Sequence, residues 1–193
     1  MDNRLDMETA AATVLGTIFM ILVYSSLAMG TAVPDYVEVQ ICAIIVTAVA
    51  AIYGSVAGGL IPLVSYLAVH ISYPRSGALT GMFFLIFFGI ATGHYATRFK
   101  IRAGKFKGIS LADYAVVEAV LAIIVWVCVQ PLCSFYLNKA DLRDTLNEGV
   151  IYCGLTVATE LIICLPILML ANSLYAKRQK AMDTGNDYLY ERE

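Results

Sequence analysis

The sequence predicts an all-α integral membrane protein, a bundle of six transmembrane helices with both termini on the cytoplasmic side. Three observations predict it. The composition is 60% hydrophobic and 15% charged, six apolar stretches fill most of the chain, and lysine and arginine gather between alternate stretches. A soluble domain carries about 25% charged residues. We expect a cytoplasmic N-terminus over residues 1–9, a membrane domain over 10–178 and a polar cytoplasmic tail over 179–193.

The six apolar stretches are long enough to be spanning helices, which need about 20 mostly apolar residues. Proline and glycine lie in the connections, as expected of helix breakers. Only Tyr53 and Gly54 separate the second stretch from the third, which predicts a tight hairpin. The predicted spans are Ala10 to Met29, Val37 to Ile52, Gly54 to Ile71, Ala78 to Thr97, Ala112 to Leu137 and Val150 to Ala176.

Basic residues set the orientation, because cytoplasmic connections of membrane proteins are enriched in lysine and arginine. With the N-terminus inside, ten of the 13 basic residues fall on the cytoplasmic side, five of them in segment 98–107. The other three fall outside. The chain begins with an acidic segment, so no cleavable signal peptide is expected. The net charge of -2 gives no reason to expect a nucleic-acid partner.

The five cysteines show no CxxC spacing, and all lie in or near apolar stretches. Buried free cysteine behaves as a small hydrophobic residue. We therefore expect no disulfide framework, no metal site and no cofactor. Cys133 and Cys153 could both lie toward the outer face, and a bridge between them stays open.

Polar residues follow helical spacing in the outer half of several spans, where neighbours on one face lie three, four or seven positions apart. Polar side chains inside a bilayer face protein or water. Stripes at one depth therefore predict a shared ligand pocket that opens to the outside. The expected ligand-binding residues are Glu160, Trp126, Gln130, Tyr66, His70, Thr156, Tyr36 and Tyr152.

Several of these residues have a second interpretation. Tyr36 and Tyr152 also fit an aromatic belt at the membrane interface. Glu160 is either a pocket group, which would favour a cationic or donor-rich ligand, or the structural partner of another helix. Glu118 lies in the inner third of the fifth span. This position favours a structural or subunit-contact role over ligand binding. Ala12 and Gly16 have a spacing that lets helices approach closely, either inside the bundle or against a partner subunit.

Four stretches carry a resemblance to a known family: Ile52 to Leu60 (IYGSVAGGL), Arg98 to Gly108 (RFKIRAGKFKG), Trp126 to Leu132 (WVCVQPL) and Tyr175 to Arg178 (YAKR). In their order and spacing, across residues 10 to 178, the chain resembles the substrate-binding S components of energy-coupling factor (ECF) transporters. The likeness is closest to the family often labelled riboflavin-type.

The resemblance implies a six-helix protein of a prokaryotic plasma membrane that binds a vitamin or related micronutrient from outside. Its implied partners are a membrane coupling subunit, docked through small residues such as Ala12 and Gly16, and two ATPase subunits. ATP hydrolysis would belong to those partners, and no phosphate-binding loop motif occurs here. The chain departs from the family pattern mainly in the expected pocket, at positions such as Ser65, Tyr66 and Cys133, which implies the same architecture with a different ligand.

Two other functions stay open. A stand-alone carrier or channel would need a polar path to both faces, and Glu118 is the residue that favours it. A membrane sensor or scaffold is the second alternative, although the tail is too short for a signalling domain. An intramembrane enzyme is not expected, because neither HExxH nor GxSxG occurs.

Overall fold

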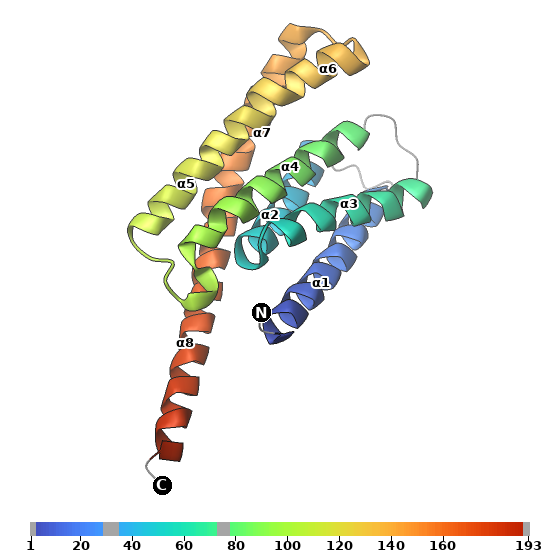
Figure 1. Ribbon diagram of the computed structural model, residues 1–193. Coiled ribbons are helices and arrows are strands. Elements are labelled where there is room, and N and C mark those ends of the chain that lie inside the picture. The colour runs from blue at the N-terminus through green and yellow to red at the C-terminus, as the bar shows by residue number, and fades with distance from the viewer. Residues whose placement is uncertain (1–2, 29–34, 73–77, 191–193) are drawn as a thin grey trace.

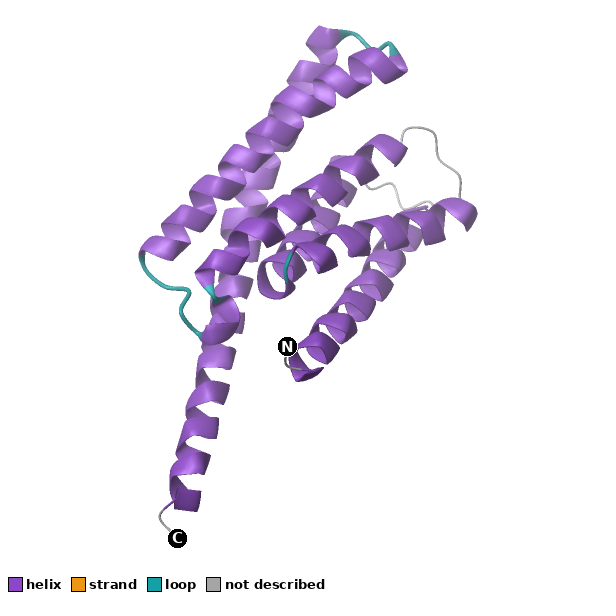
Figure 2. Cartoon of the chain, viewed as in Figure 1, coloured by secondary structure: helices purple, strands orange, loops and turns teal. Residues whose placement is uncertain are grey.

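The computed structural model describes residues 3–28, 35–72 and 78–190, and these residues form long helices packed side by side (Figure 1). Short loops join the helices, and the described residues contain no strand (Figure 2). The all-α class predicted from the sequence is therefore confirmed. Three helices, over Met7–Ser26, Ile109–Tyr136 and Leu142–Ala181, are long and apolar enough to cross a membrane.

Four helices make up the first half of the chain. Each coincides with one of the first four predicted apolar stretches. The bounds are α1 Asn3–Ala28, α2 Asp35–Tyr53, α3 Ser55–Ser72 and α4 Ala78–Ala96, followed by short 3₁₀ turns at Thr97–Phe99 and Ile101–Ala103.

The second half of the chain forms two long rods, and each rod contains a π-helical segment. The first rod runs through α5 Ile109–Ala122, a π-helical segment Ile123–Val129 and α6 Gln130–Asn138. The second runs through α7 Leu142–Thr159, a π-helical segment Glu160–Cys164 and α8 Leu165–Tyr190. The last rod extends well beyond the other helices at the C-terminal end (Figure 1). Most of the predicted polar tail is thus a continuation of α8.

Glycine allows the closest helix contacts in the first half. α3 and α4 approach so closely that a Cβ on Gly58 would clash with the backbone of Gly89, and a Cβ on Gly89 would clash with Gly58. The predicted hairpin between α2 and α3 turns at Gly54, whose φ of 96° suits glycine. The Gly54 N–H donates to the Ala50 carbonyl at 2.7 Å and ends α2.

Large apolar side chains cover much of the outer surface. Leu15 is 67% exposed, Phe83 61% and Ile162 73%, and many similar residues accompany them. A soluble monomer rarely exposes so much contiguous apolar surface. The bilayer is the environment that suits this surface, which supports a membrane protein.

Charged and aromatic groups join α1, α2, α8 and the basic segment 98–107 at one end of the bundle. Glu8 accepts hydrogen bonds from Arg102 at 2.8 Å and from Arg178 at 2.9 Å. The Arg102 guanidinium also lies over the Tyr53 ring, 5.2 Å from its centroid. The Tyr53 hydroxyl in turn lies 3.1 Å from that of Tyr175. We call Glu8, Tyr53, Arg102, Tyr175 and Arg178 the arginine lock.

The basic segment is anchored from inside by buried aromatic rings. Phe99, Phe106 and Tyr114 pack against one another, with ring centroids about 6 Å apart. The Phe106 N–H donates to the buried Asn172 side chain at 2.9 Å. Anchored in this way, the segment presents lysines such as Lys105 to the surroundings.

Candidate functional site

Trp126, the single tryptophan of the chain, lies in an aromatic group between the two halves of the bundle. Its ring stacks on that of Tyr152 from α7, with centroids 5.2 Å apart and planes inclined by 23°. Phe84 from α4 meets the Trp126 ring edge-on at 5.9 Å. Such pairs are favourable beyond the area that they bury. The contacts therefore hold the indole in one orientation.

Four buried polar atoms on the helices that form this aromatic group have no hydrogen-bond partner within the described part of the chain. They belong to α2, the first π-helical segment, α6 and α7, and are Gln40 Nε2, Trp126 Nε1, Gln130 Oε1 and Thr156 Oγ1. The great majority of buried polar groups in proteins are paired. Each one left unpaired costs about 1–3 kcal/mol. We call Gln40, Trp126, Gln130, Tyr152 and Thr156 the aromatic–amide cluster.

The π-helical segment brings α7 against Trp126. A π-helical N–H bonds to the carbonyl five residues earlier, as the Gln130 N–H does to Val125. The next residue, Pro131, has no N–H, so the Trp126 carbonyl lacks the bond that this pattern would supply. Gly149 of α7 lies directly against that carbonyl. A Cβ on Gly149 would clash with the carbonyl and lie 3.1 Å from Gln130 Oε1.

One hydrogen bond ties α2 to α7 inside the cluster. The Thr159 hydroxyl donates to Gln40 Oε1 at 3.2 Å. The Gln40 side chain is only 5% exposed, and its Nε2 remains unpaired. The hydrogen bond thus fixes the Gln40 amide through its oxygen, and the amide nitrogen can still donate to another group.

Tyr66 and His70 form a separate pair on α3. Their rings stack with centroids 5.0 Å apart, and the Tyr66 hydroxyl lies 3.2 Å from His70 Nδ1. The helix that carries them packs mainly on α1, α2 and α4. The structure thus joins these two predicted ligand-binding residues to each other and not to Trp126. The side chain of Tyr36, a further predicted residue, lies outside the described part.

Glu160 lies in a second polar group, formed where α2, α4, α5 and the second π-helical segment meet. Its Oε1 accepts a 2.7 Å hydrogen bond from Thr47, and its Oε2 accepts a 3.4 Å bond from the Tyr114 hydroxyl. Only 1% of Glu160 is exposed. The structure thus gives Glu160 partners on two other helices, which was one of its two sequence interpretations.

Glu118 belongs to the same polar group, one helical turn after Tyr114. It is 2% exposed, its carboxylate interacts electrostatically with that of Glu160, and Thr92 of α4 lies beside it. We call Thr47, Thr92, Tyr114, Glu118 and Glu160 the glutamate cluster. Sequence reasoning missed three of its members, Thr47, Thr92 and Tyr114. Helical spacing could have found one of them, because Tyr114 and Glu118 lie four positions apart.

The small residues of α1 differ in their surroundings. Gly16 is buried, and a Cβ there would lie 2.8 Å from Ile61 of α3. Ala12 is half-buried. Gly16 therefore serves the internal packing of α1 on α3, the first of the two interpretations given above. Larger apolar side chains of α1, such as Leu15 and Phe19, are the exposed ones.

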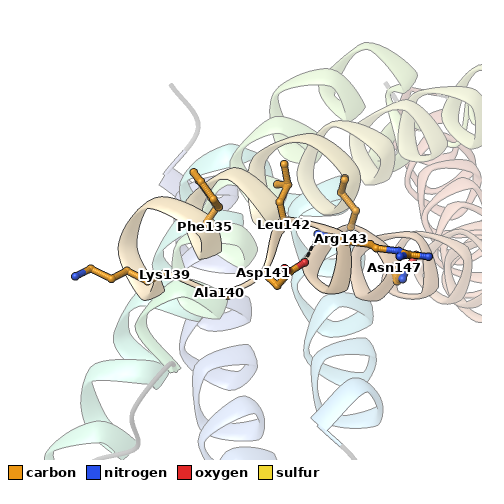
Figure 3. A pocket seen from close by; sticks show the side chains of 8 residues that line it. Phe135, Lys139, Ala140, Asp141, Leu142, Arg143 and Asn147 are labelled. Atoms are coloured by element: carbon orange, nitrogen blue, oxygen red, sulfur yellow. Dashed lines mark hydrogen bonds between the residues drawn. The ribbon is translucent and has the colours of Figure 1, made fainter.

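A surface hollow of about 690 Å³ lies at the turn between α6 and α7 (Figure 3). Asp141 caps α7 there by accepting a 2.8 Å hydrogen bond from the Arg143 N–H. The lining residues are Phe135, Lys139, Ala140, Asp141, Leu142, Arg143, Leu146 and Asn147. None of them is a predicted ligand-binding residue, so this hollow is distinct from both clusters.

No family model, curated protein or solved structure matches this chain. Its side chains and their geometry are therefore the basis for a functional assignment.

Proposed function

We propose that the protein is the membrane-embedded substrate-binding subunit of an ECF-type importer, which captures a vitamin or related micronutrient outside a prokaryotic cell. Six helices cross the plasma membrane in this proposal, with both termini in the cytoplasm. The observation that carries it is the aromatic–amide cluster. Its four unpaired polar atoms lie on four helical segments, and each of these segments also contributes an apolar residue to the group around Trp126. Ligand sites combine an apolar lining with a few such polar groups.

The unpaired atoms define the chemistry of the ligand. Gln40 Nε2 and Trp126 Nε1 donate hydrogen bonds, Gln130 Oε1 accepts one, and the Thr156 hydroxyl does either. A matching ligand presents at least two acceptors and one donor. A heterocycle with a lactam or amide edge has this pattern, and its flat ring suits the stacked pair of Trp126 and Tyr152. Glu160 bonds to Thr47 and Tyr114 and does not belong to the aromatic–amide cluster. A ligand of the aromatic–amide cluster therefore does not need a positive charge.

The arginine lock supports a partner-binding role for the opposite end of the bundle. Three of the four stretches that carry the ECF resemblance meet there, through Tyr53, Arg102 and Tyr175. The adjoining basic segment is anchored by buried rings and presents exposed lysines. In the proposed complex this end and the apolar outer face of α1 contact the coupling subunit. The two ATPase subunits would hydrolyse ATP and drive release of the ligand inward.

Ligand capture is tested by native mass spectrometry of the protein purified in mild detergent, followed by titration of any retained molecule. Trp126 is the only tryptophan, so intrinsic fluorescence reports on this cluster directly. We expect a saturable change in emission for the wild type. Calorimetry should show at least tenfold weaker binding for Gln130→Leu, as expected when a buried hydrogen bond is lost.

A matched control is Gln179→Leu, which makes the same substitution on the exposed surface of α8. It should bind the ligand as the wild type does. Equal affinity for Gln130→Leu and wild type would remove the aromatic–amide cluster from the ligand site. A preparation that retains neither a ligand nor ATPase partners would argue against the importer itself.

Orientation is tested with single cysteines and a membrane-impermeant maleimide. The background replaces all five native cysteines with serine or alanine, because Cys128 is exposed and Cys133 and Cys153 are partly exposed. Lys105→Cys should react only when the cytoplasmic side is open to the reagent, and Lys139→Cys should react in intact cells. The reverse pattern would overturn the proposed topology.

A second candidate, a stand-alone carrier, is favoured by the glutamate cluster. Two buried carboxylates inside a membrane bundle are typical of ion or proton pathways. Solute uptake by the purified protein alone in liposomes, without ATPases, would support this candidate. Uptake that depends on added coupling and ATPase subunits would support the importer.

A further inference from the structure

The two carboxylates of the glutamate cluster lie together in the interior without a basic partner. Glu118 and Glu160 are 2% and 1% exposed, and they interact electrostatically with each other. In the described residues, the ion pairs link Glu8 to Arg102 and to Arg178, and neither glutamate of the cluster takes part. A buried charge that lacks a partner costs several kcal/mol. A proton, a bound cation or both must therefore balance the charge of this pair.

Two oxygens of the cluster are poorly bonded and point to a bound group. In the described residues neither Glu118 Oε2 nor the Thr92 hydroxyl has a hydrogen-bond partner of good geometry, although Thr92 is only 1% exposed and lies close enough to Glu118 for a weak hydrogen bond. Glu160, in contrast, has both oxygens bonded, one to Thr47 and one to Tyr114. Hydrogen bonds thus satisfy both carboxylate oxygens of Glu160. Glu118 Oε2 and the Thr92 hydroxyl lack well-formed hydrogen bonds, so this side of the cluster has room in its bonding for a further group.

We propose that the glutamate cluster binds one monovalent alkali cation between Glu118, Thr92 and Glu160. Carboxylate and hydroxyl oxygens are hard ligands, which suit alkali and alkaline-earth ions better than transition metals. In the described residues no three His, Cys, Asp or Glu side chains are grouped to hold a metal ion. Calcium sites use six to eight oxygens, including several carboxylates, so a pair of glutamates fits a single positive charge better.

Charge balance agrees with this assignment. Two buried carboxylates that interact electrostatically do not readily ionise together. One proton on the pair leaves a single negative charge, and one alkali cation then makes the cluster neutral. The site adjoins the aromatic–amide cluster, since the Glu160 N–H donates to the Thr156 carbonyl. It goes beyond the proposed function, since neither a vitamin ligand nor an ATPase is needed for it.

The test is thermal unfolding of the purified protein in detergent, with Na⁺ or K⁺ replacing choline at constant ionic strength. We expect at least one of the two metals to raise Tm saturably. The rise should be about 5–10 °C at one hundred times the dissociation constant. Glu118→Gln and Glu160→Gln should abolish it. Glu148→Gln, which removes an exposed carboxylate, is the matched control and should keep the full response.

Thr92→Val keeps the proposal testable if the glutamine variants fail to fold. It removes one neutral oxygen and should raise the half-saturating cation concentration roughly tenfold. Equal Tm values in Na⁺, K⁺ and choline would overturn the proposal. So would a response to pH or Ca²⁺ alone, or a full alkali-cation response in Thr92→Val.

Discussion

Replacing Gly149 with alanine tests the close approach of α7 to Trp126. The added methyl group would overlap the Trp126 carbonyl and come within 3.1 Å of Gln130 Oε1. Backbone cannot yield as a flexible side chain does, so α7 must move away from the π-helical segment. Overpacking of this kind costs roughly 1–3 kcal/mol. For a chain of this size, that corresponds to a fall in Tm of about 2–12 °C.

The matched control for this variant lies on the same helix. Gly154 is exposed, and a Cβ there would meet nothing within 4 Å. Gly154→Ala should leave Tm unchanged or raise it slightly, because alanine favours helix by about 1 kcal/mol over glycine. Differential scanning fluorimetry measures both variants, and Trp126 emission shows whether the Tyr152 stack has shifted. A Tm for Gly149→Ala equal to that of Gly154→Ala would refute the close approach.

Three further predictions concern other parts of the bundle. Thr47→Val removes the 2.7 Å hydrogen bond to Glu160 and should lower the stability by about 1.5–3 kcal/mol, measured by thermal unfolding; an unchanged Tm would contradict this role. Gly54→Ala places a side chain at a φ of 96° and should cost about 1–2 kcal/mol, whereas Gly81→Ala, with open space around it, should not. Glu8→Gln should lower Tm at low salt, with the difference shrinking at high salt as charges are screened; a difference that ignores salt would rule out an electrostatic role.

The positions of the helices could be predicted from the sequence because hydropathy and breakers are local signals. Gly54 ends one apolar stretch and begins the next, and the structure turns there. The polar tail was harder to predict. No proline follows Pro166, and α8 continues to Tyr190, since nothing in that segment forces the helix to stop.

The candidate site could be predicted only in part. Trp126, Gln130, Tyr152 and Thr156 follow helical spacing, and the structure gathers them. The two π-helical segments are what the sequence reasoning lacked, because a wider turn changes which residues share a face. Hydrogen bonds between helices that are distant in the sequence could not be predicted either. Thr47 meets Glu160 from 113 positions away, and no local pattern reports such a contact.

The arginine lock has a consequence for the order in which the bundle assembles. Glu8 and Arg178 are 170 positions apart. At about 5–20 residues per second, a ribosome needs roughly 8–34 seconds between them. During that interval the first helix is complete, while Arg178, which forms the second ion pair of Glu8, has not yet been made. The contact between Glu8 and Arg178 therefore cannot form, and this end of the bundle cannot close fully, until the final helix has been synthesised.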